Sequence, residues 1–135
     1  MGYTHYYLKT RKTTQQEWNE FVKTCKKLKK NLPKRTSIAG GYYENDLIKI
    51  ACGDGTGRPY FNRHCVCFNG KDDLSHETFY IGAKDNEKSW KFCKTSRKPY
   101  DLLVVACLLA AYQILDYRFA SDGFCKDNDV SDLQE

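Results

Sequence analysis

The stretch FCKTSRKPYD, residues 92–101, places cations beside hydroxyls immediately before the most apolar segment of the chain. The cations are Lys94, Arg97 and Lys98, and the hydroxyls belong to Thr95 and Ser96. Arginine grips a phosphate through two parallel hydrogen bonds, lysine adds a point charge, and hydroxyls donate to phosphate oxygens. A helix N-terminus attracts anions and disfavours cations. The pattern therefore predicts either a solvated turn that caps the helix or a phosphate-binding turn.

The histidines are the candidate acids and bases. His76-x-Thr78 matches half of a two-histidine phosphoesterase, in which two His-x-Ser/Thr strands face one phosphate. The second copy is absent, because Tyr-Tyr follows His5 and Cys-Val follows His64. A lone polar or stacking histidine is one interpretation, and acid–base catalysis by His76 or His5 is the other.

Other patterns point away from metals and from established catalytic sets. His64 and Cys65 point to opposite faces if they lie on a strand, and no second ligand pair has zinc-site spacing. The acidic segment 127–132 lacks the glycine and the terminal glutamate of a calcium loop. GDGTG at 53–57 is typical of a hairpin turn, with a phosphate cradle as the alternative. No Ser-His-Asp or Cys-His set can be placed, so we predict no catalytic residue, metal or cofactor.

Aromatic side chains exceed what the core of a 135-residue chain requires. They are Tyr3, Tyr6, Tyr7, Tyr42, Tyr43, Tyr60, Phe61, Phe79, Tyr80 and Trp90. Adjacent residues on a strand face opposite ways, so one member of each pair is expected to be exposed. Exposed aromatics beside cations suit base stacking, and the alternative is an aromatic core with tyrosine rims.

Composition bounds the class of protein. A chain of 135 residues with 41% hydrophobic residues predicts one domain over 1–126, followed by a polar acidic tail at 127–135. The first residues lack the layout of a signal peptide, and the apolar run 102–112 is about half a membrane span. The 7 cysteines form no C-x-x-C pair, which favours reduced, mostly core thiols. We therefore expect a cytoplasmic, non-membrane protein.

Hydrophobic periodicity predicts an α+β fold in which a mainly antiparallel sheet packs against two helices. The helices are an amphipathic one over 14–32, opened by a Thr14–Glu17 capping box, and a buried one over 99–117. The strands are expected at 3–10, 46–52, 58–69, 77–83 and around Phe119. This order is compatible with a ferredoxin-like plan that carries an added hairpin.

The net charge of +5 is unevenly distributed. Residues 1–35 hold ten Lys or Arg against Glu17 and Glu20, and many of these lysines lie on the helix 14–32. Such a face is usually only solvated, but it offers a second class of function. In that alternative the helix binds nucleic acid or an acidic host protein.

Four segments together resemble a family of small proteins from phages and prophages. They are GYTHYY at 2–7, LSHETF at 74–79, FCKTSRKPYD at 92–101 and SDG at 121–123. Ser96 stands where the family commonly has alanine, and the region after SDG lacks the family's tryptophan. The resemblance implies a phage origin and is compatible with a role against host defence.

The leading hypothesis is a phage protein that sequesters a phosphorylated nucleotide immune signal, of the cyclic oligonucleotide or cyclic ADP-ribose type, without cleaving it. Lys94, Thr95, Arg97 and Lys98 are predicted to hold phosphates. His76, His5 and Tyr100 are predicted to line the pocket. The enzymatic alternative is a phosphodiesterase or nucleotide-modifying enzyme. The ligand, the host system and a homo-oligomeric state remain open from the sequence.

Overall fold

The computed structural model describes residues 3–36, 47–52 and 55–122 of the chain. The described chain contains two α-helices and mainly antiparallel strands, which confirms the predicted α+β class. The elements are β1 Thr4–Leu8, α1 Gln15–Lys30, β2 Ile50–Ala51, β3 Tyr60–Phe61, β4 Cys65–Gly70, the 3-10 helix η1 Asp72–Leu74, β5 Phe79–Gly82, β6 Trp90–Lys94, α2 Asp101–Leu115 and β7 Arg118–Ser121. The predicted tail at 127–135 and Tyr42 and Tyr43 lie outside the described residues.

Strand β1 is the centre of a three-stranded sheet with the order β6-β1-β7. Both neighbours run antiparallel to β1, so β6 and β7 run parallel to each other and α2 connects them. This is one βαβ half of a ferredoxin-like plan. Strand β5 instead pairs with β4, whose other partners are β2 and β3, in a second sheet.

Three strand predictions need correction. The expected strand 58–69 is divided into β3 and β4, because Asn62 turns the chain: its side-chain oxygen accepts from the amides of His64 and Cys65 at 2.8 and 3.1 Å. The expected strand 46–52 is reduced, within its described part, to β2. Strand β6 was not predicted, since charged residues interrupt its apolar ones.

The amphipathic helix α1 follows its sequence pattern. The Thr14 capping box is present in both directions, and the helix buries Trp18, Phe21, Val22 and Cys25. Its lysines at 23, 26, 27, 29 and 30 are exposed. The indole of Trp18 donates to the carbonyl of Asn62 at 3.0 Å, which joins α1 to the turn before β4.

Helix α2 begins at Asp101, two residues later than predicted, and Asp116 ends it in a left-handed conformation with φ 58°. Seven of its residues are buried, but Leu102, Leu109 and Tyr112 are exposed. The predicted burial of this helix therefore holds for only one of its sides. Neither described helix has the length and hydropathy that a membrane crossing requires.

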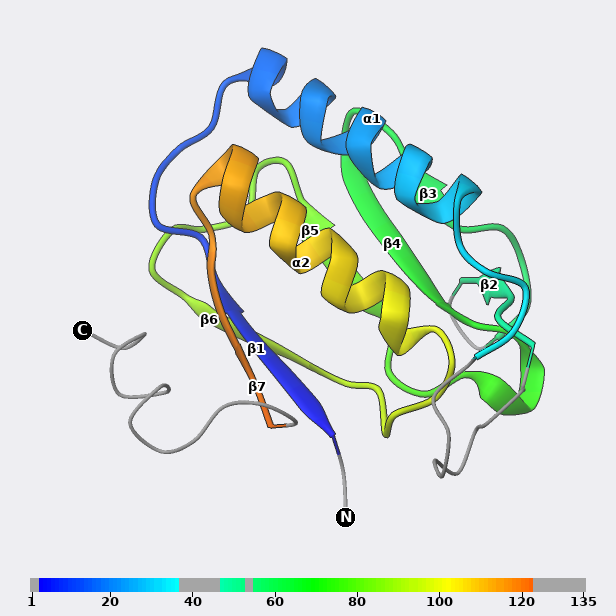
Figure 1. The fold of residues 1–135 in the computed structure, drawn as a ribbon. Coiled ribbons are helices and arrows are strands. Elements are labelled where there is room, and N and C mark those ends of the chain that lie inside the picture. The colour runs from blue at the N-terminus through cyan, green and yellow to red at the C-terminus, as the bar shows by residue number, and fades with distance from the viewer. Residues whose placement is uncertain (1–2, 37–46, 53–54, 123–135) are drawn as a thin grey trace.

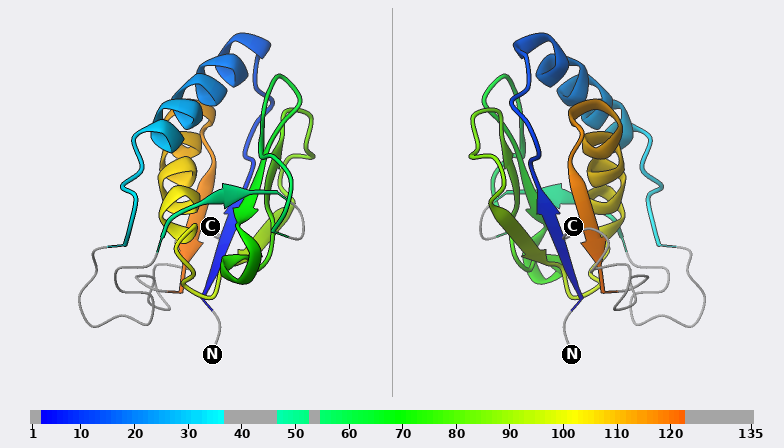
Figure 2. Two further views of the ribbon diagram at one scale, coloured as in Figure 1. Left: turned by 90° about the vertical axis from the view of Figure 1, so that its right-hand side faces the viewer. Right: turned by 90° about the vertical axis from the view of Figure 1, so that its left-hand side faces the viewer.

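Both helices lie on the same side of the strands, packed against each other (Figures 1 and 2). One core cluster joins side chains of both helices and both sheets, among them Phe21, Phe68, Phe79 and Leu108. The six cysteines within the described ranges are free thiols, as predicted. Cys25, Cys93 and Cys107 are fully buried, and the other three are half-buried.

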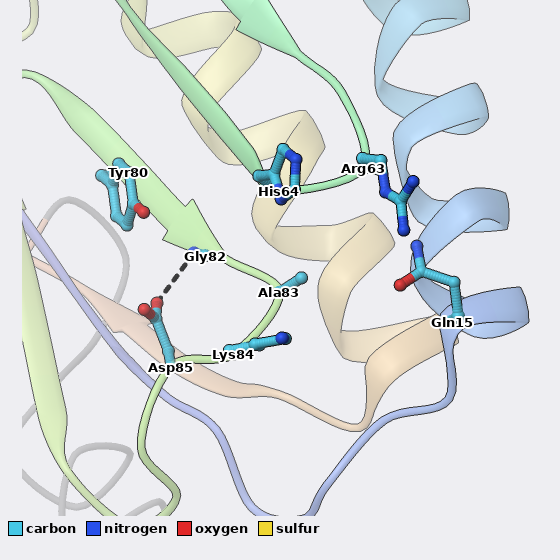
Figure 3. A pocket seen from close by; sticks show the side chains of 8 residues that line it. All are labelled: Gln15, Arg63, His64, Tyr80, Gly82, Ala83, Lys84 and Asp85. Carbon is cyan, nitrogen blue, oxygen red and sulfur yellow. Dashed lines mark hydrogen bonds between the residues drawn. The ribbon is translucent and has the colours of Figure 1, made fainter.

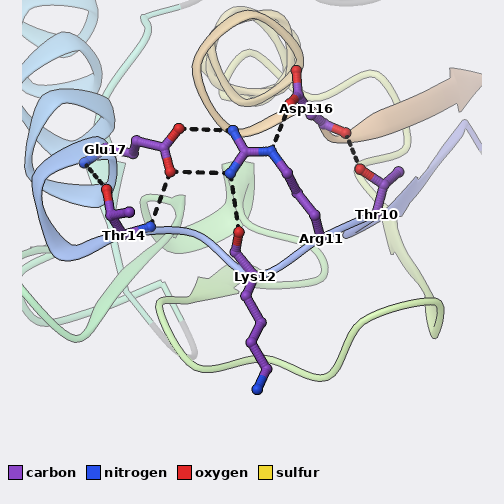
Figure 4. Close-up of polar contacts among 6 residues, drawn as sticks. All are labelled: Thr10, Arg11, Lys12, Thr14, Glu17 and Asp116. Carbon is purple, nitrogen blue, oxygen red and sulfur yellow. Dashed lines mark hydrogen bonds and ion pairs between the residues drawn. The ribbon is translucent and has the colours of Figure 1, made fainter.

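The loop between β1 and α1 ties the start of α1 to the end of α2 through Arg11 (Figure 4). Its guanidinium donates to both carboxylate oxygens of Glu17, at 3.0 and 2.7 Å, and to Asp116 at 2.6 Å. Thr10 adds a bond to the carbonyl of Asp116 at 2.7 Å. The hydrogen bonds from Arg11, followed by that from the Thr14 amide, lower the pKa of Glu17 to about 2.

This depressed pKa predicts a pH-dependent contribution of Glu17 to stability. The carboxylate stabilises the fold above its ordinary pKa, near 4.5, and the contribution disappears as the pH falls toward 2. We therefore expect Glu17→Gln to unfold more easily than the parent protein at pH 7. The difference should shrink between pH 4.5 and 2 in urea titrations, and a constant difference across that range would contradict the assignment.

Candidate functional site

The basic turn that precedes α2 is built around an internal carboxylate. Ser96 and Arg97 both adopt left-handed backbone angles, with φ 52° and 58°, which fold the chain back after β6. The Thr95 hydroxyl, fully buried, then donates to Asp101 Oδ1 at 2.6 Å. Asp101 is the first residue of α2, where a negative charge is favoured by the helix dipole. The anion expected at this helix end is therefore supplied by the chain itself.

Asp101 also joins a buried hydrogen-bond network through His5. The His5 ring lies between two partners: Nε2 contacts Asp101 Oδ1 at 2.5 Å, and Nδ1 contacts the hydroxyl of Ser121. Both contacts are satisfied when Nε2 donates to the carboxylate and Nδ1 accepts from Ser121. The network links β1, α2, β7 and the residue after β6.

The composition of this network is Ser-His-Asp, which the sequence alone did not reveal. A nucleophilic serine must reach the substrate, and the base must exchange a proton at the reacting atom. Ser121 and His5 are fully buried, while the Asp101 side chain is 21% exposed. Both ring nitrogens of His5 are already engaged. In this conformation the arrangement joins secondary-structure elements and offers no access for a substrate.

Two cations of the basic turn, Arg97 and Lys98, contact other groups of the chain through their side chains. The Arg97 guanidinium lies over the ring of Tyr3, with Cζ 4.4 Å from the ring centre. Lys98 Nζ donates to the carbonyl of Asp73 at 2.7 Å. Lys94 ends β6 and is half-buried, and its backbone amide donates to Glu77 Oε1 at 2.6 Å.

The remaining two predicted residues are Tyr100 and His76, and Tyr100 contacts Glu77, the neighbour of His76 and the residue that Lys94 also contacts. Tyr100 is fully buried and donates to the carbonyl of Glu77 at 2.5 Å. His76 is exposed, and its backbone is held by the Asn69 side chain, with both hydrogen bonds at 2.9 Å. The structure thus brings His5 and Thr95 together through Asp101. Their assignment to a ligand stays a prediction.

The hydroxyl of Ser121 gives a direct test of the buried network. Ser121→Ala leaves His5 Nδ1 buried without its hydrogen-bond donor, and such a loss costs about 1–3 kcal/mol. We expect urea denaturation to show a decrease of that size in the free energy of unfolding. Ser89→Ala, at an exposed position outside the network, is the matched control. Equal stability of the two variants would show that the hydroxyl does not satisfy the ring.

A cavity of about 440 Å³ lies elsewhere, between the start of α1, the turn joining β3 to β4, and the loop after β5 (Figure 3). Its lining residues are Gln15, Arg63, His64, Tyr80, Gly82, Ala83, Lys84 and Asp85. Figure 3 shows the side chains of Arg63 and Gln15 pointing toward one another from opposite walls. None of the residues predicted to bind the ligand belongs to this lining.

The walls of the cavity are held by backbone contacts. The amide of Ala83 donates to the carbonyl of His64 at 2.9 Å, which joins the two turns. Lys9, although buried, extends its ammonium to the carbonyls of Ala83 and Asp85 at 3.2 and 3.1 Å. The loop after β5 is therefore held by Lys9, which follows β1, and by His64, which precedes β4.

The polar lining favours an anionic ligand. Arg63, His64 and Lys84 are exposed at the cavity, whereas its carboxylate, Asp85, is occupied. Asp85 accepts from the amide of Gly82 at 2.8 Å and forms an ion pair with Lys91. The phenol of Tyr80 is protonated at neutral pH and can donate a hydrogen bond, and partial desolvation raises its pKa further above the ordinary value.

Sequence reasoning missed this site because its basic residues come from separate turns. Arg63 and Lys84 are 21 positions apart, and neither lies in a recognisable motif. The available signal was the polar end of GAKD, directly after the expected strand 77–83, and the polar residues of FNRH, which lie inside the expected strand 58–69. In the glycine-rich segment predicted as a hairpin turn, Gly55 has φ 95°, and its amide donates to the carbonyl of Cys52 at 3.1 Å. Gly53 lies outside the described residues.

Within the described residues, no group of three or more His, Cys, Asp or Glu side chains is placed to hold a metal ion. Comparisons with protein-family models, with curated proteins and with solved structures find no match to this chain. Functional inference therefore depends on the geometry and chemistry of the sites themselves.

Proposed function

We propose that this protein binds a small phosphorylated nucleotide in the cavity between α1, the β3–β4 turn and the loop after β5, and retains it without cleavage. The observation that carries the proposal is the grouping of Arg63, His64 and Lys84 around one cavity whose carboxylate is internally neutralised. The proposal moves the phosphate-binding role predicted from the sequence to a different set of cations.

The size of the cavity supports a small-molecule ligand. Its volume of about 440 Å³ falls within the roughly 300–1,000 Å³ that such sites occupy. Arg63 suits a bidentate contact with a phosphate, and Lys84 adds a second positive charge. The exposed ring of Tyr80 at the same wall offers a stacking surface for a base.

The proposal of retention rests on the two histidines predicted as acids or bases, neither of which lines the cavity. His5 is sealed within the core, and His76 lies outside the cavity lining. His64 is the histidine that a ligand in the cavity would contact. In a bacterial host, a phage protein of this kind would remove a cyclic oligonucleotide or cyclic ADP-ribose signal before its receptor responds.

The decisive experiment tests cyclic dinucleotides, cyclic trinucleotides and cyclic ADP-ribose isomers against the purified protein. We expect one of them to raise the melting temperature and to be recovered intact by chromatography after heat denaturation. Recovery of an altered compound would replace retention by catalysis and would make His64 the first residue to examine. A melting temperature unchanged by the whole panel would contradict nucleotide binding.

Variants then locate the site. Arg63→Ala is expected to weaken binding of the nucleotide found in the panel by about 1.5–3 kcal/mol, the range for a hydrogen bond to a charged group, as measured by calorimetry. Lys26→Ala, which removes an exposed cation from α1, should leave the affinity unchanged. Arg97→Ala tests the basic turn before α2 as the alternative binding site. A loss of affinity with Arg97→Ala alone would return the ligand to the predicted turn.

A further inference from the structure

The outward face of the sheet β6-β1-β7 carries a cluster of exposed aromatic side chains. Phe92 is 67% exposed, Trp90 38% and Tyr6 37%. Tyr6 lies directly opposite Phe92 in the β1–β6 pairing, and Trp90 is opposite Leu8, the next outward residue of β1. The three rings therefore belong to adjacent positions on one surface, here called the aromatic face.

The opposite face of the same sheet is buried against the rest of the core. His5 and Tyr7 alternate with Tyr6 along β1 and are buried, and Cys93 does the same on β6. Both helices lie on that inner side, as the two views of Figure 2 show. The outward rings are therefore not part of the core cluster of the described residues, and an external partner can bury them. The split of Tyr6 and Tyr7 to opposite faces agrees with the alternation predicted from the sequence.

Cations border the aromatic face. Lys94 lies opposite Thr4 at one end of the β1–β6 pairing, and Arg118 lies opposite Leu8 on the other neighbour of β1. Acids are present at this end as well, and backbone amides engage them: Asp122 accepts from the Thr4 amide at 3.2 Å, and Glu77 Oε1 accepts from the Lys94 amide at 2.6 Å. The chain as a whole carries a net charge of +5. An anionic partner is therefore favoured over a second copy of this cationic chain.

We infer that the aromatic face binds single-stranded nucleic acid, with unpaired bases stacked on Phe92, Trp90 and Tyr6 and the backbone phosphates near Lys94 and Arg118. Alternate residues of a strand are about 6.6 Å apart, so Trp90 and Phe92 can each receive one base of a splayed strand. Stacking of this kind tolerates any base, because every base has a π-face. A duplex conceals its bases and cannot use the rings in this way.

This site is separate from the proposed nucleotide cavity. The cavity lining comes from α1, the β3–β4 turn, β5 and the loop that follows it, and includes no residue of β1, β6 or β7. It is also separate from the exposed lysines of α1, which belong to the helical side of the molecule. The failure of one proposal can therefore be distinguished from the failure of the other.

The test uses fluorescence anisotropy with labelled single-stranded oligoadenylate of about eight nucleotides, within the site sizes seen for stacking platforms. RNA and DNA versions form two arms, and the corresponding duplex is the third. We expect the protein to bind the single strands more tightly than the duplex. Phe92→Ala and Trp90→Ala should each weaken this binding about 5- to 150-fold. Phe92→Tyr, which keeps a ring, should retain it.

Tyr112→Ala is the matched control, because it removes an exposed aromatic from α2 on the other side of the sheet. It should leave the affinity for the oligonucleotide unchanged, and so should Arg63→Ala in the cavity. Quenching of Trp90 fluorescence on binding provides a second readout, since Trp18 is buried in the core.

Four outcomes would overturn the inference. One is equal affinity for single strands and duplex, and another is unchanged affinity in both Phe92→Ala and Trp90→Ala. The third is the absence of oligonucleotide binding together with self-association that Phe92→Ala abolishes, which would assign the face to a second copy of the chain. Loss of binding only when the charges of Lys26, Lys27 and Lys30 are reversed would likewise assign nucleic-acid binding to α1.

Discussion

The carboxylate of Asp101 is the point on which the first sheet and the second helix depend. It accepts hydrogen bonds from Thr95 and from the His5 ring, whose other nitrogen is engaged by Ser121. A buried polar group that loses its partner costs free energy of the order of a few kcal/mol. These buried groups keep their hydrogen bonds only when the strand order β6-β1-β7 and the start of α2 form at the same time. Among the described residues, no buried side-chain nitrogen or oxygen lacks a hydrogen-bond partner.

This constraint changes the meaning of the basic segment before α2. Asp101 belongs to the same segment as these cations and supplies a negative charge at the start of α2, so the helix end needs no external phosphate. Arg97 and Lys98 instead make contacts with Tyr3 and with the backbone of Asp73. The cations that surround a cavity are Arg63 and Lys84, which lie on turns fastened to each other through the amide of Ala83. The charged side chains of this protein indicate a ligand site only after their partners within the chain have been identified.

The two proposed binding surfaces use the same chemistry in different shapes. The cavity combines Arg63 and Lys84 with the ring of Tyr80 within a concave space, which suits one small nucleotide. The aromatic face presents Phe92 and Trp90 along a strand, which suits successive bases of a longer chain. The shared helical and sheet core keeps the two surfaces apart. Each can therefore be removed by substitution without the loss of the other.

Local pattern determined most of the secondary structure of this protein. Helical spacing and the Thr14–Glu17 capping box predicted α1, and apolar continuity predicted α2. The aromatic, β-prone residues of YTHYYLKT predicted β1, and strand geometry then predicted the opposite orientations of Tyr6 and Tyr7. All these signals depend on neighbouring residues. Strand β6 was missed since its charges obscure the alternation. Only the tertiary structure decided that His5, Asp101 and Ser121 meet, that Asp85 is neutralised by Lys91, and that Arg63 and Lys84 share a cavity. These pairings join residues far apart in the chain, and their positions follow from strand register and helix packing, which no local pattern encodes.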